Sequence, residues 1–287
     1  MDQGNLGAWI GQSQQDFGSL DVGTALRACA TLMPEAAGHI RNGDPMPPLW
    51  HWFAFVPSAS MTELGNDGHP KFGRWLPALH HDRRVWTGGE VSFLGRLHVG
   101  ETLERKSTIL SIHEAQVARG HTVHISVEHR ISGEAGLAVV ERQDVAYLPI
   151  PDAFVPPEAE PAPHTSDFEH RVTVSEPLLF RYSALTFNAH RIHYDLPYAQ
   201  EVERYPGLVL HAPLQAQLLM HQAVAHRGEP PSHFAFEGIH PMFHHDEVRL
   251  MGIEESDGRM QLCTAAGAGH QGMRATATWE EALRNAA

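Results

Sequence analysis

The pattern of apolar and polar residues repeats once along the chain. Each half of the chain contains a strand, a bend and then three strand-like runs separated by turn-forming residues. The six runs lie at 106–113, 121–130, 137–148, 247–254, 259–265 and 272–279. Short turns such as 132–134 and 256–258 between strand-like runs are typical of antiparallel sheet, so the pattern predicts one such sheet in each half.

An apolar segment ahead of the second set of strands predicts a helix from about 211 to 226. Pro213 fits its first turn, where a missing N–H costs nothing. Apolar residues occupy most of its circumference, so the helix should be buried. The segment 47–55 is the candidate counterpart in the first half, and it could be a helix or a strand. A helix wrapped by an antiparallel sheet is the hot-dog arrangement, so we expect an α+β double hot-dog with two such sheets, each around a central helix.

A proline-rich, acidic segment divides the chain near its middle. Residues 149–163 contain six prolines and have little helix or strand potential, so they should form a semi-rigid spacer. The sequence therefore predicts an N-terminal hot-dog domain at 1–148, a linker at 149–168 and a C-terminal hot-dog domain at 169–287.

Composition narrows the class of protein. The chain has 287 residues, is 42% hydrophobic and has no apolar run long enough to span a membrane. It begins without a secretion signal, and its two cysteines, Cys29 and Cys263, make no metal or redox pattern, so we expect reduced thiols in a cytoplasmic protein. A formal charge of −13 argues against nucleic acid or an anionic membrane as a partner, whereas a few arginines could still bind a small anion.

The candidate chemistry lies in two nearby segments. Asn188 and His193 place an amide and an imidazole five positions apart, directly after an apolar run. The segment 205–214 then supplies a glycine turn that opens into the predicted buried helix. Together they provide groups that hold a water molecule and move its proton, and a backbone N–H at a helix start that can stabilise negative charge. Addition of water to a carbonyl-activated double bond needs these groups.

Several motifs resemble known families. Residues 186–195 are similar to the signature of MaoC-like hydratases, and 207–214 resembles the helix start of that family. The motifs at 48–52, 67–70 and 83–89 look like the N-terminal half of type 2 hydroxyacyl-thioester dehydratases and of bacterial mesaconyl-CoA and itaconyl-CoA hydratases. The chain departs from the MaoC-like pattern at Asn188, Arg191 and Ala212, where the family usually has Asp, Pro and Gly. The type 2 branch resembles this chain in having Asn at the first of these positions.

The resemblance implies roles for the central residues. His193 would be the general base, and Asn188 would orient the water through hydrogen bonds. The backbone N–H of Ala212 would stabilise the enolate oxygen at the positive end of the helix. One active site per chain is expected, between the halves, with a non-catalytic N-terminal domain shaping the pocket. An acyl-CoA substrate, a homodimer, and the absence of a cofactor or metal are also implied.

Other candidate residues keep more than one interpretation. Arg191 could pair with a substrate carboxylate, contact a CoA phosphate or remain solvated. Arg83 and Arg84 could reach the CoA phosphates or stabilise the interface between the domains. Gly207 and His211 belong to the helix start and are candidates for substrate binding.

Residues in and around the motif at 186–195 also have alternative interpretations. Tyr182 is a packing residue or a substrate contact, and Asp195 is a helix cap or a partner of an imidazole. His190 and His193, with Asp195, also have the spacing of a zinc site. The spacing matches the hydratase loop better than a metal site.

These expectations lead to one function with alternatives. The first is a cofactor-independent hydro-lyase that converts itaconyl-CoA or mesaconyl-CoA to citramalyl-CoA. The second is a 3-hydroxyacyl-thioester dehydratase of fatty acid metabolism. A hot-dog thioesterase is a third, although the predicted helix at 211–226 has no Asp or Glu of the kind that thioesterases of this fold usually use. A non-catalytic acyl-CoA-binding protein is the fourth.

Overall fold

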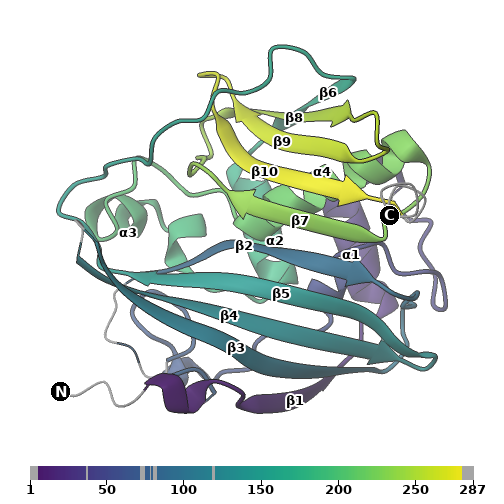
Figure 1. Cartoon of the computed structure of the whole chain (residues 1–287), viewed down its shortest axis with the longest axis horizontal. Coiled ribbons are helices and arrows are strands. Elements are labelled where there is room, and N and C mark those ends of the chain that lie inside the picture. The colour runs from purple at the N-terminus through teal and green to yellow at the C-terminus, as the bar shows by residue number, and fades with distance from the viewer. Residues whose placement is uncertain are drawn as a thin grey trace.

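The computed structural model describes residues 6–36, 38–71, 75–77, 79, 83–117 and 120–279. Within these residues ten strands form one sheet in the order β1-β3-β4-β5-β2-β7-β10-β9-β8-β6, with every neighbouring pair antiparallel (Figure 1). The strands are β1 (Ser13–Gly18), β2 (Arg83–Phe93), β3 (Leu103–Val117), β4 (Gly120–Gly133), β5 (Gly136–Leu148), β6 (Phe168–Thr173), β7 (His233–Gly238), β8 (Glu247–Glu254), β9 (Met260–Ala266) and β10 (Gln271–Thr278). All six predicted runs are therefore confirmed as strands.

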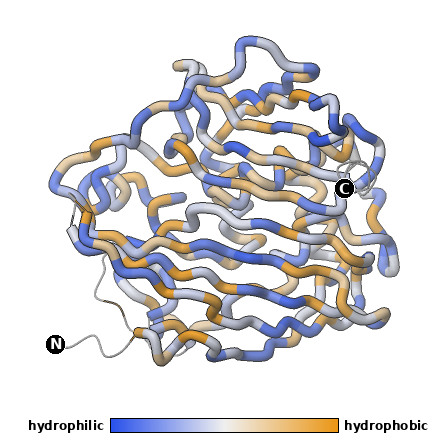
Figure 2. Tube along the Cα trace, in the orientation of Figure 1, coloured by the Kyte–Doolittle hydropathy of each residue, from blue (hydrophilic) through white to orange (hydrophobic). Residues whose placement is uncertain are grey.

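The longer helices lie on one face of this sheet, behind it in Figure 1. The α-helices are α1 (Val22–Leu32), α2 (Glu176–Leu185), α3 (Leu196–Glu201) and α4 (Ala212–Arg227). Short 3-10 helices are η1 (Leu6–Trp9), η2 (Pro34–Ala36), η3 (Trp50–Phe53), η4 (Met61–Glu63) and η5 (Arg191–His193). Hydrophobic and hydrophilic positions alternate along the strands, as expected for a sheet with one covered face (Figure 2).

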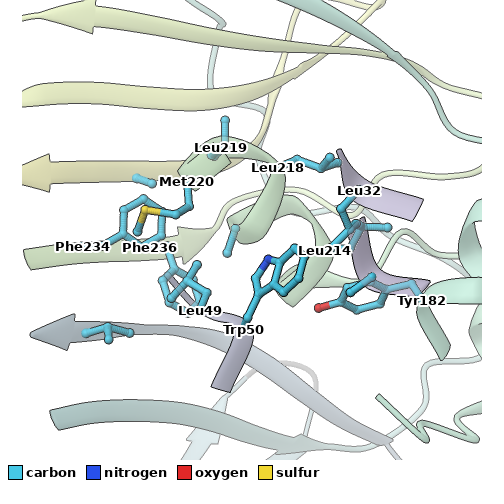
Figure 3. Packing of buried hydrophobic residues seen from close by; sticks show 14 of the residues in the cluster. Leu32, Leu49, Trp50, Tyr182, Leu214, Leu218, Leu219, Met220, Phe234 and Phe236 are labelled. Atoms are coloured by element: carbon cyan, nitrogen blue, oxygen red, sulfur yellow. The ribbon is translucent and has the colours of Figure 1, made fainter. Parts of the chain in front are cut away.

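The central helix α4 matches the prediction to within one residue at each end. His211 is its N-cap, Pro213 lies in its first turn, and Gly228 ends it in the left-handed conformation with φ of 83°. Its side chains are buried on nearly all sides, and Leu214 and Leu219 belong to the main core cluster with Phe234 of β7 (Figure 3). This helix under an antiparallel sheet is the predicted hot-dog arrangement.

The expected counterpart at 47–55 forms neither a long helix nor a strand. Leu49 has φ of 68°, which prevents a regular helix from starting there, and only the 3-10 turn η3 follows. The turn is held against α4, because Trp50 Nε1 donates to His221 Nε2 at 2.9 Å and Gln217 Nε2 donates to the Leu49 carbonyl at 3.1 Å. The longer helix of the first half is α1, which the apolar pattern did not reveal.

The two halves join in one continuous sheet. Strand β2 pairs with β7 from Gly88 to Ser92, and its register against β5 on the other side shifts between Trp86 and Gly88. Side chains at Gly88 and Gly89 would clash with backbone carbonyls of the two flanking strands, so the glycine pair permits this close packing. The predicted linker runs without a strand between β5 and β6, and its Phe154 packs against the second half.

Two composition-based expectations can be compared with the structure. Cys29 and Cys263 are both buried, and neither forms a disulfide. None of the described helices has the length and apolar character required to cross a membrane.

Candidate active site

The motif loop between α2 and α3 is fixed by hydrogen bonds of its own. The chain leaves α2 through Phe187, which has φ of 49°, and the Asn188 N–H donates to the Ser183 carbonyl at 2.8 Å. The Asn188 Oδ1 then accepts the backbone N–H of His190 at 3.0 Å. The side-chain oxygen of Asn188 therefore holds the loop, which leaves its amide N–H group as the part that can bind a ligand.

His193 is buried and oriented by two contacts. Its Nδ1 lies 2.8 Å from the Val209 carbonyl oxygen, so Nδ1 carries the proton and donates it. Its ring stacks on that of His211, with ring centroids 3.6 Å apart and planes 18° from parallel. Burial lowers the pKa of His193 to about 3, and the charge of His190 acts in the same direction. The imidazole is therefore neutral near pH 7, and its Nε2 can accept a proton.

The start of α4 lies directly beside this imidazole. His211 Nε2 contacts the Ser183 hydroxyl at 2.9 Å, and burial holds the pKa of His211 well below its usual value. Ala212 is the first residue of α4, so its N–H has no acceptor within the helix. That N–H is available to an oxygen atom that carries negative charge.

A large cavity brings most of the predicted site residues together. Its volume is about 1760 Å³, and both halves of the chain line it. The predicted residues among its lining are Arg83, Arg84, Tyr182, Asn188, His193, His211 and Ala212. Tyr182 is fully buried and contacts the His211 ring edge-on at 4.9 Å, so it also packs beneath the site.

Two predicted residues do not line the cavity. Gly207 lies in the turn before α4, where a side chain would press against His244 and His245. The Arg191 guanidinium donates to Asp195 Oδ2 at 2.8 Å and lies 4.0 Å from the centre of the Tyr198 ring. This arrangement does not support a substrate contact for either residue. Asp195 is confirmed as the N-cap of α3, because its Oδ1 accepts the Tyr198 N–H.

Arg83 joins the two halves through a buried ion pair. Its Nε donates to Glu203 Oε2 at 3.0 Å, another of its N–H groups donates to the Glu203 carbonyl, and its guanidinium lies 4.4 Å from the centre of the Tyr205 ring. Glu203 is completely buried and also binds His190 Nε2 at 3.0 Å. Of the two interpretations of Arg83, these contacts support the stabilisation of the interface.

A loop of the first half reaches the site through Asp67 and His69. His69 lines the cavity, and its Nδ1 donates to Asp67 Oδ2 at 2.9 Å. Its ring lies 4.1 Å from that of His190, which in turn lies 5.3 Å from that of His193. Gly68, with φ of 89°, permits the contact, since a side chain there would clash with the Ala189 carbonyl.

Only some of these residues around His193 could be recognised from the sequence. Asp67 and His69 belong to the motif at 67–70, so the resemblance of that motif was a signal that could have identified them. His190 and Glu203 were missed as partners, and a glutamate among polar loop residues gives no sign that it will be buried.

The residues whose spacing in the sequence resembles a zinc site are engaged in other contacts. His193 binds a carbonyl and Asp195 binds Arg191, so neither faces a shared centre with His190. Among the described residues, the trio with metal-like spacing is Asp67, His69 and His190, whose ligand atoms lie within 4.8 Å of one another. Each of these imidazoles already contacts a carboxylate, Asp67 or Glu203, which accounts for the cluster without an ion.

Comparison with known proteins agrees with this geometry. Residues 49–244 match the family of hydroxyacyl-thioester dehydratases type 2. The chain is 40% identical over 252 residues to a mesaconyl-C(4)-CoA hydratase of Chloroflexus aurantiacus, which covers 87% of this chain and 89% of the relative. It is 25% identical over 229 residues to a mitochondrial hydroxyacyl-thioester dehydratase type 2 of Schizosaccharomyces pombe, covering 71% of this chain and 76% of that protein.

Solved structures share the fold at low sequence identity. A MaoC-like dehydratase from Phytophthora capsici superposes with a TM-score of 0.72 at 12% identity, covering 96% of this chain and 98% of that one. A Mycobacterium tuberculosis protein described as having a double hot-dog fold superposes with a TM-score of 0.59 at 13% identity, covering 93% and 95%. The double hot-dog fold is therefore confirmed.

Proposed function

Because the chain belongs to the type 2 hydroxyacyl-thioester dehydratase family of MaoC-like hot-dog proteins, it is a hydro-lyase of acyl thioesters, and we propose that it adds water reversibly to a C5 dicarboxylic enoyl-CoA. The substrates proposed are mesaconyl-C4-CoA and itaconyl-CoA, with citramalyl-CoA as the product. The observation that carries this proposal is the placement of the His193 imidazole beside the free N–H of Ala212 in one cavity.

With mesaconyl-C4-CoA, whose double bond is conjugated with the thioester, the proposed reaction uses these groups in two steps. His193 Nε2 takes a proton from water while the water oxygen bonds to the β-carbon, and the thioester carbonyl becomes an enolate. The Ala212 N–H donates to the enolate oxygen, which is where negative charge develops. The enolate then collapses as the α-carbon takes the proton from His193, which returns to its neutral form. Asn188 orients the water by donating a hydrogen bond from its side-chain N–H group.

A 3-hydroxyacyl-thioester dehydratase of fatty acid metabolism is the second candidate. Two yeast relatives are named mitochondrial hydroxyacyl-thioester dehydratase type 2, and the cavity wall includes the apolar side chains of Phe55, Trp52 and Trp86. These side chains would accommodate a hydrocarbon chain as well as a short acid. A thioesterase is less consistent with the site, because α4 contains no Asp or Glu.

A panel of enoyl-CoA substrates tests the proposal. Mesaconyl-C4-CoA, itaconyl-CoA, crotonyl-CoA and longer enoyl-CoAs are incubated with the enzyme, and gain of one water is followed by mass spectrometry. We expect kcat/KM for the better dicarboxylic substrate to exceed that for crotonyl-CoA at least about 10-fold, since a paired carboxylate contributes on the order of 1.5–3 kcal/mol. Faster hydration of crotonyl-CoA and longer chains would assign the fatty acid reaction, and release of free thiol would assign a thioesterase. Activity that survives exhaustive chelation would exclude a required, removable metal ion.

The setting of the enzyme is a separate part of the proposal. We propose that it acts in the cytoplasm as a homodimer. Phe17, Met61, Phe180 and Phe187 are exposed apolar side chains among the residues that line the cavity, and a second copy of the chain would cover such a surface. A monomeric mass in solution would contradict the dimer.

A further inference from the structure

Four cationic side chains of the first half line the cavity, and three of them have partners that account for them. Arg83 is paired with Glu203, Arg105 with Asp16 at 2.9 Å, and the exposed Lys71 donates to a backbone carbonyl. Arg84 differs from these three. Within the described parts of the chain its guanidinium forms no ion pair with a carboxylate, and its polar neighbour is the hydroxyl of Tyr147. A partly buried cation without an acid partner is costly unless an anionic ligand completes the site.

The position of Arg84 directs its side chain into the acyl cavity. Arg84 lies on β2 directly opposite Tyr147 of β5, and cross-strand partners share one face of a sheet. Trp86, two residues along β2, is on the same face and packs against Trp52. The cavity is lined by Arg84 and by the aromatic side chains of Tyr147, Trp86 and Trp52. Arg84 therefore supplies a positive charge to an aromatic part of the cavity wall.

His69 lies beside Arg84 and connects it to the proposed base. Both side chains line the cavity. Burial is the main reason that the pKa of His69 lies well below its usual value, and the charge of Arg84 acts in the same direction. Because Nδ1 of His69 is held by Asp67, its Nε2 is the ring atom left for a ligand. His69 contacts the His190 ring, and His190 contacts the His193 ring, so Arg84 and His69 lie near the place where water is added.

The proposed substrate would place its own anionic group close to His193. In mesaconyl-C4-CoA the free carboxylate is attached to the β-carbon, the atom that water attacks. Its binding residue must therefore lie close to His193 but need not touch the CoA. The sequence suggested Arg191 for this role, but Arg191 is bound to Asp195 outside the cavity lining.

We propose that Arg84, with His69 beside it, forms the subsite that binds the free carboxylate of the substrate. This inference rests on the proposed hydratase function and names the residues that set its substrate class. The guanidinium offers paired N–H donors that match a carboxylate. Arg191 contributes indirectly, because its backbone N–H donates to the Asp67 carbonyl and its Nη1 donates to the Asn66 carbonyl, which fixes the loop that carries His69.

Arg84→Gln tests the subsite with two substrates that differ only in the carboxylate. Crotonyl-CoA is mesaconyl-C4-CoA without that group, and both carry the same CoA. We expect kcat/KM for mesaconyl-C4-CoA to fall at least about 10-fold while that for crotonyl-CoA changes less than about 3-fold. Arg84→Lys should recover part of the loss, and His69→Gln should reduce the same preference. Arg130→Gln, at an exposed arginine of β4, is the matched control.

The possible outcomes separate this inference from the proposed function. An equal loss on both thioesters would show that Arg84 binds the CoA phosphates or supports the fold, and no loss on either would remove it from the site; both results overturn the subsite. If the wild-type enzyme hydrates no enoyl-CoA, the proposed function fails. Calorimetric binding of methylsuccinyl-CoA and butyryl-CoA then still decides whether Arg84 recognises a carboxylate. Arg84→Lys provides the same comparison if Arg84→Gln does not fold.

Discussion

At the scale of single residues, the site depends on which ring nitrogen of each histidine is already occupied. The Nδ1 of His193 donates to Val209, and the Nδ1 of His69 donates to Asp67. Both rings therefore direct the opposite nitrogen, Nε2, away from their fixed partner. The sequence shows that these histidines are present, but only the three-dimensional neighbours determine their tautomers.

The role of His193 can be tested with a substitution that preserves its structural contact. In His193→Asn the amide N–H can still donate to the Val209 carbonyl, but the proton acceptor is lost. We expect kcat to fall about 10²–10⁴-fold with little change in thermal unfolding, because general base catalysis is typically of that size. His39→Ala, at an exposed loop histidine, serves as the control. Turnover near the wild-type rate in His193→Asn would remove His193 from the mechanism.

At the scale of elements, the site forms where structures from both halves meet. The loop 186–195 and the start of α4 come from the second half, whereas the loop with Asp67 and the strand β2 come from the first. The halves are held together by the β2–β7 pairing and by Arg83 with Glu203. The N-terminal half thus contributes cavity-lining groups near the proposed base, in addition to the wall of the pocket that the sequence predicted.

The buried ion pair gives a prediction for this interface. Arg83→Met leaves the Glu203 carboxylate buried without its strongest partner, so we expect unfolding free energy to fall by about 3 kcal/mol or more in urea titrations. The double variant Arg83→Met with Glu203→Gln should recover much of the loss, because the unpaired charge is also removed. Equal stability of the single and double variants would contradict a coupled pair.

At the scale of the whole molecule, several buried histidines make stability depend on pH. Burial is the main cause in each case, lowering the pKa of His193 to about 3 and those of His129 and His221 to about 4. His211 is shifted in the same direction. These groups are neutral in the folded protein, whereas in the unfolded chain they take up protons below about pH 6.5.

Acidification should therefore destabilise the fold. Below about pH 6.5 the unfolded state binds more protons than the folded state, so the stability present at neutral pH declines as the pH falls toward 4. Each such histidine adds a slope of up to about 1.4 kcal/mol per pH unit. Urea unfolding at pH 7, 6 and 5 measures this slope. A constant free energy of unfolding across that range would show that these histidines are not neutral in the folded protein.

Much of the fold and part of the site could be predicted from local sequence. The six strand runs and α4 followed from apolar spacing, because burial of one face or all faces imposes a period on the chain. The motif residues Asn188, His193 and Ala212 line one cavity, as the paired segments suggested. Helix α1 could not be recognised in this way, and the segment at 47–55 was misjudged because its conformation depends on contacts with α4.

What the sequence determined by itself is most of the strands, the central helix α4 and the type of chemistry, since these depend on residues close together in the chain. The tertiary structure decided which residues share the cavity. In the folded protein Arg191 pairs with Asp195 and Arg83 pairs with Glu203, whereas Arg84 and His69 line the cavity. Arg83 and Glu203 are 120 residues apart, and Arg191 also donates to the carbonyl of Asn66, 125 residues away. The energy of a charge is set by the partners that folding places beside it, which no local pattern specifies.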